Sequence, residues 1–206
     1  SDNGTQLTKG VDYDLSYENN VNVGKATVNI TFKGNYTGTR SVNFNIIAKA
    51  LSNDLVDISE TTAQTYTGSE ITPTPTIKFG DVTLVKDKDY TLSYEDNVNA
   101  GKAKINVSFI GNYSGTATSS FDIIPDVLNQ EKVSISETTA QTYTGSAITP
   151  TPTIKYGDVT LVKDKDYNLT YTDNVNVGKA KINVSFIGNY SGSATTNFDI
   201  IPDVLN

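Results

Sequence analysis

The chain has 206 residues, a formal net charge of -7 and a pI near 4.5, and it contains no Cys, His, Met or Trp. An acidic chain lacks the clustered Lys and Arg of a phosphate-binding surface, so nucleic acid is not expected as a partner. Without His and Cys the common catalytic arrangements for acid–base and nucleophilic chemistry cannot form, and disulfides are excluded. No apolar run reaches membrane-spanning length, so membrane insertion is not expected.

The sequence repeats itself with a period of 77 residues. Tyr13, Tyr90 and Tyr167 are equivalent, and 63 of the 72 residues of 58–129 recur in 135–206 without a gap. Residues 1–54 align with 78–131, so the first copy lacks the front of its unit and the chain is expected to belong to a longer protein. Self-similarity at a fixed period indicates an array of like domains. We predict a partial repeat over 1–54 (repeat 1) and further repeats over 55–131 (repeat 2) and 132–206 (repeat 3).

The elements of one repeat are predicted from alternation of apolar and polar residues. Such alternation over 103–109, with its equivalents 26–32 and 180–186, predicts a strand with one dry and one wet face. Residues 90–94 alternate as well, and the loop 95–101, rich in turn formers and ending in Gly, predicts a hairpin between the two strands. After the tight connection 111–115, a closing strand is expected over 117–123.

The front of the repeat is more extended and less regular. Short strands are predicted at 133–135 and 160–162. Pro150 and Pro152 forbid a helix between them, so 148–154 is expected to be an edge strand or a polyproline-like stretch. No segment shows a helical stripe. The pattern predicts an all-β chain of compact β-sandwiches.

The connection 124–132 between repeats 2 and 3 is short and carries a proline, Pro125, which fixes φ. It also holds Val127 and Leu128, which are apolar enough to pack against either neighbour. These features predict a semi-rigid joint rather than a free tether. The corresponding connection 48–54 has no proline and is expected to bend more.

Several motifs of the repeat resemble a known family. Asp89-Tyr90, Tyr94, the turn through Gly101 and the run Gly111-Asn112-Tyr113-Ser114-Gly115 resemble bacterial immunoglobulin-like tandem repeats of Gram-positive surface proteins. The resemblance covers about the last two thirds of each repeat. It implies small immunoglobulin-like β-sandwich domains arranged end to end, in a secreted or cell-wall-attached protein outside the cell. It implies no catalytic residues.

The loop after the first hairpin strand offers a calcium alternative. Asp or Asn oxygens, the ligand type that calcium prefers, cluster there in repeats 2 and 3 at Asp96, Asn97, Asn99, Asp173, Asn174 and Asn176. The structural reading is a turn in which Asn and Asp tolerate a left-handed backbone. Because the ligand set of a calcium loop is not visible, neither a metal nor another cofactor is expected.

Aromatic side chains in the front segment offer a ligand-binding alternative. The candidates are Tyr66, Tyr143, Phe79 and Tyr156. Without Trp the usual stacking platform for sugars is weak, and tyrosines in such repeats more often cover the edge of a core.

A lysine cross-link and a catalytic carboxylate pair are two further possibilities, and for both a plain structural role is the expected one. A lysine cross-link of the kind found in some Gram-positive stalks would use Lys102, but alternation points Lys102 away from the face of Ala103, towards water. A carboxylate pair would use Asp87 and Asp89, which lie in a charged turn where such groups are usually solvated.

The expected function is a non-catalytic structural or adhesive array, a stalk or spacer in which each repeat adds length. The alternative is a weak module that binds a host or cell-wall glycan or protein and uses repetition for avidity. Repeat 1, which lacks its front, is expected either to borrow a strand from a neighbouring molecule or to pack against repeat 2.

Overall fold

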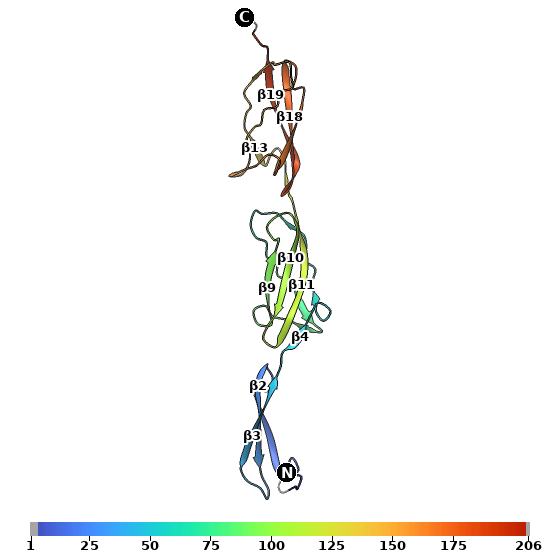
Figure 1. The fold of residues 1–206 in the computed structure, drawn as a ribbon, viewed down its shortest axis with the longest axis vertical. Helices are drawn as coiled ribbons and strands as arrows, with labels where there is room; N and C mark the ends of the chain where they lie inside the picture. Colours follow the sequence, from blue (N-terminus) through green and yellow to red (C-terminus); the bar gives the residue numbers. More distant parts are fainter. Residues whose placement is uncertain (1–3, 205–206) are drawn as a thin grey trace. The chain divides into compact units, whose positions relative to one another are not determined.

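The computed structural model describes residues 4–204, and every regular element within them is a β-strand (Figure 1). The strands of repeat 1 and the linker after it are β1 (Tyr13–Glu18), β2 (Gly24–Phe32), β3 (Thr39–Ile46) and β4 (Lys49–Leu51). Those of repeat 2 and its linker are β5 (Asp57–Ile58), β6 (Gln64–Thr65), β7 (Ile77–Phe79), β8 (Val82–Thr83), β9 (Tyr90–Glu95), β10 (Gly101–Phe109), β11 (Tyr113–Ile124) and β12 (Asp126–Leu128). Those of repeat 3 are β13 (Val133–Ile135), β14 (Gln141–Thr142), β15 (Ile154–Tyr156), β16 (Val159–Thr160), β17 (Tyr167–Thr172), β18 (Gly178–Phe186) and β19 (Tyr190–Ile201). The all-β prediction is confirmed.

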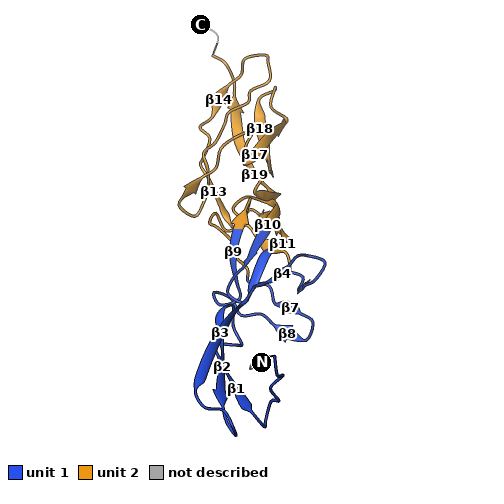
Figure 2. Cartoon of the chain, turned by 60° about the horizontal axis from the view of Figure 1, so that its bottom comes forward, with its two compact units in different colours: residues 1–60, 74–93, 105–119 blue, residues 61–73, 94–104, 120–206 orange. Residues whose placement is uncertain are grey.

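The chain divides into two compact units (Figure 2). One comprises residues 1–60, 74–93 and 105–119, and the other comprises residues 61–73, 94–104 and 120–206. The boundary runs through β9, β10 and β11 of repeat 2. Each linker therefore lies in the same unit as the residues that it contacts in the repeat before it and in the repeat after it.

Repeat 3 shows how alternation builds the core. β18 pairs antiparallel with β17 and β19, and its inward residues are buried, namely Ala180, Ile182, Val184 and Phe186. The front contributes a smaller sheet in the order β13-β15-β16. Residues of both sheets, among them Val133, Ile154 and Leu161 from the front, meet in one apolar cluster. The dry face predicted from period two is thus covered by the front of the repeat.

The front segment of repeat 3 is held by short strands and, between them, by single hydrogen bonds. β13 spans the residues predicted for it, whereas the short strand expected at 160–162 lies at Val159–Thr160. The stretch around Pro150 and Pro152 joins no ladder, because proline lacks the N–H that a ladder needs. Instead, the Tyr171 hydroxyl donates a hydrogen bond to the Pro150 carbonyl oxygen at 2.8 Å.

Repeat 1 has the hairpin strands without the front. Its sheet has the order β1-β2-β3. On the face that corresponds to the buried face of repeat 3, Val42 is 50% exposed and Phe44 is 42% exposed. A shallow hollow on this face is lined by Leu7, Leu15, Ile30 and Phe32 among others. This apolar face is uncovered because Val133 and Ile154 have no counterpart in repeat 1, which keeps Leu7 at the position of Leu161.

Candidate functional site

The most distinctive recurring geometry of the chain lies at the two connections between repeats. Joint 1 links repeats 1 and 2 through β4, and joint 2 links repeats 2 and 3 through β12. Each linker strand pairs parallel with the start of the last long strand of the following repeat, β4 with Tyr113–Gly115 and β12 with Tyr190–Gly192. The linker is thus an edge strand of the next repeat's sheet.

The last residue of each linker strand is a buried leucine. Leu51 is 3% exposed and Leu128 is fully buried, each inside the core of the following repeat. Pulling one such side chain back into water would cost about 2 kcal/mol. The apolar linker residues therefore pack against the following repeat.

A glycine permits this close approach. Gly115 and Gly192 have φ of +97° and +96°, and a Cβ on either would run into the carbonyl oxygen of Leu51 or Leu128. Only a residue without a side chain fits both the backbone angle and the contact. The final glycine of the GNYxG motif is therefore required by the linker strand.

An asparagine clamps the preceding repeat in both joints. In joint 1 the N–H of Val23 donates to Asn112 Oδ1 at 2.8 Å, and Asn112 Nδ2 donates to Asn22 Oδ1 at 2.8 Å. In joint 2 the N–H of Ala100 donates to Asn189 Oδ1 at 2.8 Å, and Asn189 Nδ2 donates to Asn99 Oδ1 at 2.9 Å.

The same asparagine also holds the linker through its backbone. Its carbonyl oxygen accepts from the N–H of Lys49 in joint 1 and of Asp126 in joint 2, each at 3.0 Å. One residue of the following repeat therefore holds both the linker and a turn of the preceding repeat. We call this arrangement the asparagine clamp.

An aromatic cluster is added at joint 2. The rings of Tyr66 and Tyr156 both meet Tyr190 edge to face, with centroids 5.5 Å and 6.1 Å away. Tyr66 belongs to repeat 2 and the other two belong to repeat 3. Burial, followed by the electrostatic influence of Tyr66 and Asp166, raises the pKa of Tyr190 to about 12. The neutral phenol of Tyr190 is therefore favoured, and its ring packs against Tyr66 of the preceding repeat.

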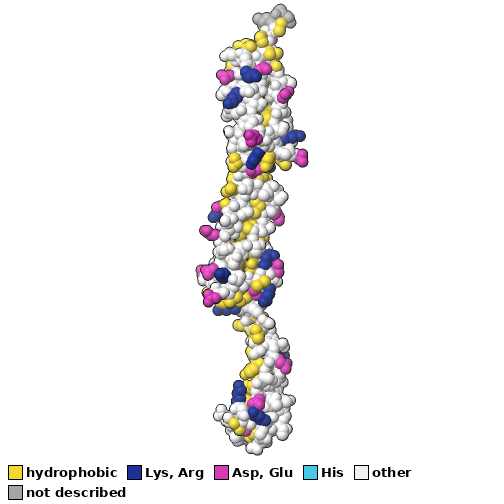
Figure 3. Space-filling view, turned by 180° about the vertical axis from the view of Figure 1, so that it is seen from behind, with side chains coloured by type: hydrophobic (Ala, Val, Ile, Leu, Met, Phe, Trp, Pro, Cys, Tyr) yellow, Lys and Arg dark blue, Asp and Glu magenta, His cyan; other side chains and the backbone are white. Residues whose placement is uncertain are grey.

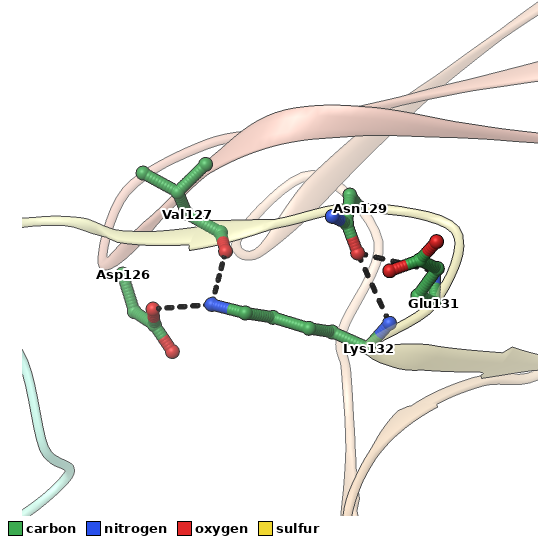
Figure 4. A network of polar contacts seen from close by, with 5 residues as sticks. All are labelled: Asp126, Val127, Asn129, Glu131 and Lys132. Carbon is green, nitrogen blue, oxygen red and sulfur yellow. Dashed lines mark hydrogen bonds and ion pairs between the residues drawn. The ribbon is translucent and has the colours of Figure 1, made fainter.

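A polar network fixes the linker of joint 2 (Figure 4). Lys132 Nζ lies 3.2 Å from Asp126 Oδ1 and donates to the Val127 carbonyl oxygen at 2.6 Å. Asn129 Oδ1 accepts from the backbone N–H groups of Glu131 and Lys132, each at 3.1 Å. A hydrogen bond to Asp126 raises the pKa of the Tyr156 hydroxyl, which therefore donates as a neutral phenol. The network ties the linker strand to the first turn of repeat 3.

The calcium candidates serve the turn and the front segment. Asp96 and Asp173 adopt left-handed backbones with φ of +54° and +57°. The side chains of Asn97 and Asn174 donate to the carbonyl oxygens of Ile71 and Ile148. Asn99 accepts from the clamp, and Asn176 is its exposed equivalent in repeat 3. Within residues 4–204 no group of three or more acidic side chains is placed to hold a metal ion.

The four aromatic candidates are not gathered on one surface. Tyr66 and Tyr156 pack at joint 2, and Phe79 meets Tyr113 edge to face at 6.2 Å. Tyr143, the equivalent of Tyr66, is 39% exposed. Of the four, only Tyr143 presents an open ring.

Asp89 was expected to be solvated, and this prediction is wrong. Asp89 is only 8% exposed, and its Oδ2 accepts from the N–H of Val85 at 2.8 Å. Asp166 makes the same bond to Val162. Each carboxylate closes its own turn, because the N–H that it accepts from lies only four residues earlier in the chain. Lys102, in contrast, is exposed as alternation predicted, outside the buried setting that a cross-link requires.

Sequence reasoning missed the asparagine clamp. Asn112 and Asn189 were interpreted only as parts of a tight turn. Their partners lie 89 and 90 residues away, so no local pattern could reveal them. The one available signal was the recurrence of Asn in the GNYxG motif of every copy.

The described residues contain no helix that is long and apolar enough to cross a membrane. No protein-family model, curated protein or solved structure matches the chain. The joints are therefore interpreted from their own geometry.

Proposed function

We propose that this chain is a tandem array of immunoglobulin-like repeats that serves as a non-catalytic stalk or spacer of a bacterial surface protein. In this proposal the protein acts outside the cell, secreted or attached to the wall of a Gram-positive bacterium. The observation that carries the proposal is the recurrence of one joint. A linker strand, a glycine and an asparagine clamp occur 77 residues apart with the same partners.

A recurring joint is what a spacer needs. If each repeat meets the next through the same contacts, every added repeat contributes the same increment, and copy number sets reach. The buried leucine and the clamp both oppose free swinging of the linker. A flexible tether would instead leave the linker without partners.

The surface of the chain fits this role. Charged side chains of both signs are interspersed over the face seen in Figure 3, without a large patch of one sign. The net charge of -7 keeps the array soluble. Three of the four aromatic candidates for ligand binding are engaged in packing, which favours the spacer over a sugar-binding module.

Small-angle scattering on chains extended by one, two and three further copies of residues 130–206, one full period each, tests the proposal. We expect the maximum dimension to grow linearly, with the same increment for each copy. A maximum dimension that levels off as copies are added, as for a compact globule, would refute the spacer.

A further inference from the structure

Each linker strand runs in the same direction as the last strand of the repeat that follows it. β12 lies beside the start of β19, with Asp126 opposite Tyr190 and Leu128 opposite Gly192, and β4 lies beside β11 in the equivalent register. The chain enters repeat 3 through β12 and leaves it at the far end of β19, which is 12 residues long. Tension along the chain therefore pulls β12 towards its N-terminus and β19 towards its C-terminus.

This direction of load strains the backbone pairs together. The hydrogen bonds of a parallel ladder cross from one strand to the other, so strands that are pulled in opposite directions along their axes strain every bond at once. If the two strands were pulled apart from one end instead, the pairs would open one after another, and each would resist alone. The parallel linker strand is thus loaded in the stronger of the two directions.

The pair cannot relieve the load by slipping in register. The side chain of Leu128 is fully buried in the core of repeat 3. A slip of one residue would turn the linker side chains to the opposite face. A slip of two residues towards the N-terminus would bring Gln130 into the site of Leu128, and an amide is costly to bury in an apolar core. The linker strand must therefore detach rather than slide.

A side chain extends the attachment beyond the linker strand. Gln130 Oε1 accepts from the N–H of Thr195 in β19 at 2.8 Å. In repeat 2 the equivalent Asn53 accepts from the N–H of Thr118 at 2.9 Å and donates to its carbonyl oxygen at 2.7 Å. The contact recurs with two different amide side chains, and it fastens the linker further along the same strand.

A second parallel pair lies at the other end of the last strand. β14 pairs with the last two residues of β19, and β6 pairs in the same way with the last two residues of β11. The N–H of Tyr143 continues the first of these pairs by donating to the carbonyl oxygen of Ile201 at 2.9 Å. The linker and the front segment are therefore both attached parallel to the strand through which the chain leaves the repeat.

We propose that the chain bears mechanical load, and that the parallel pair of linker strand and last strand is the element that resists unfolding of repeats 2 and 3 under tension. This function goes beyond that of a spacer, because a spacer sets a distance whether or not it withstands force. The inference follows from the strand pairing alone, so it does not depend on the proposed spacer function.

Two pulling directions applied to the full chain test this load path in repeat 3. The chain contains no Cys, so a pair of introduced cysteines fixes where the handles attach. Ile124→Cys with Asp203→Cys, the shear chain, loads repeat 3 along β12 and β19. Ile124→Cys with Lys163→Cys, the peel chain, moves only the second handle. All three positions are exposed.

The second handle of the peel chain lies at the end of repeat 3 where the linker enters. Lys163 belongs to the turn before β17, and in that turn the carbonyl oxygen of Asp166 accepts from the N–H of Ile187, just after β18, at 2.9 Å. The Asn189 carbonyl oxygen, two residues further on, accepts from the N–H of Asp126. The peel chain therefore pulls β12 away from β19 beginning at its first pair.

Optical tweezers at a constant loading rate compare the two chains. We expect the shear chain to unfold at about three times the force of the peel chain, because three backbone pairs are loaded together in one and singly in the other. The released length, about 3.5 Å for each residue between the handles, identifies the event as unfolding of repeat 3. Urea unfolding without load should give both chains the same midpoint.

Two proline variants of the shear chain, one position apart, test the ladder itself. Asp126→Pro removes the N–H that bonds the Asn189 carbonyl oxygen at 3.0 Å. The N–H and C=O of one strand residue point to the same side, and the Val127 carbonyl oxygen accepts from Lys132 rather than from β19 (Figure 4). Val127→Pro therefore leaves the ladder bonds in place. Asp126→Ala removes the carboxylate, keeps the N–H and is a second control.

Asp126→Pro should lower the unfolding force of the shear chain by about a third, since it breaks one of three pairs. Val127→Pro and Asp126→Ala should each lower the force by less than about half as much.

Equal unfolding forces in the two pulling directions would overturn the proposal, because the load would then not be carried by the pair of β12 and β19. A shear force that Asp126→Pro lowers no more than Val127→Pro would overturn it as well. The comparison of directions needs neither proline variant, so it stands even if Asp126→Pro fails to fold. Neither result depends on how length grows with copy number, so the spacer and the load-bearing pair can fail separately.

Discussion

The two joints share a constant part and differ in a variable part. Both have the parallel linker strand, the buried leucine, the close-approach glycine and the asparagine clamp. Joint 2 adds the pair of Lys132 with Asp126, the bond from Tyr156 to Asp126, and the contact of Tyr66 with Tyr190.

Joint 1 lacks these additional contacts because the residues that make them in joint 2 are replaced by others. Lys49, Leu55 and Phe79 occupy the positions of Asp126, Lys132 and Tyr156, and none of the three offers a carboxylate or a phenol. Repeat 1 has no counterpart of Tyr66, since that residue lies in the front segment. The comparison indicates that backbone pairing and the clamp define the joint, whereas side-chain contacts adjust its strength.

The largest effect should come from the shared leucine. Leu128→Ala removes a fully buried side chain from the core of repeat 3, and Leu51→Ala does the same in repeat 2. We expect each change to lower the free energy of unfolding of its repeat by about 3 kcal/mol. Hydrogen exchange resolved by repeat measures this loss. A negligible loss for Leu51→Ala beside a large loss for Leu128→Ala would show that the joints do not share this part.

The second largest effect should come from Gly192, the close-approach glycine of joint 2. Gly192→Ala combines an unfavourable φ with a collision against Leu128, and we expect a loss of about 2 to 3 kcal/mol in repeat 3. Gly178→Ala is the matched control, because Gly178 also has positive φ but open space around its Cβ, and it should cost about 1 kcal/mol. Equal losses for the two variants would remove the steric part of the argument.

High pH should weaken joint 2 through Tyr190. The phenol has a pKa of about 12 in the folded chain and about 10 in the unfolded chain, so folding favours the protonated form. The stabilisation is complete below pH 10 and is lost as the pH rises from 10 to 12, by up to about 2 kcal/mol. Urea unfolding between pH 8 and pH 12 measures the slope. Tyr190→Phe should reduce it, and an unchanged slope would be inconsistent with a buried phenol.

The smallest effect should come from the contact of Tyr66 with Tyr190, which joint 2 has and joint 1 lacks. Tyr66→Ala removes the ring that repeat 2 places on Tyr190 and should lower the stability of repeat 3 by about 1 kcal/mol. Tyr143→Ala is the control, because its exposed ring has no aromatic partner within residues 4–204, and it should change stability by less than about 0.5 kcal/mol. Chemical denaturation followed by repeat-resolved NMR signals compares them. Similar small effects would mean that the ring contact contributes nothing across joint 2.

The sequence was informative wherever the signal lay in the alternation of neighbouring residues. Alternation identified the buried face through Ala180, Ile182 and Val184, and it placed Lys102 in solvent. The bounds of β13 were predicted as found. These features depend on neighbours one or two residues away, which period two captures.

Most of the features that were missed depend on contacts with distant residues or with another repeat. The clamp joins residues 89 and 90 positions apart, and the linker becomes a strand only because the next repeat offers an edge. The burial of Asp89 depends on the turn curling back to the Val85 N–H, which charge pattern alone does not reveal.

The clamp is tested most directly by amide hydrogen exchange at three equivalent positions in one dilute sample, namely Val23, Ala100 and Val177. After correction for intrinsic rates, Val23 and Ala100 should exchange more slowly than Val177, because within residues 4–204 only the first two donate to an asparagine of a following repeat. Asn189→Ala should bring Ala100 to the rate of Val177 and leave Val23 unchanged. Equal rates at all three amides in the unmodified chain would contradict the account.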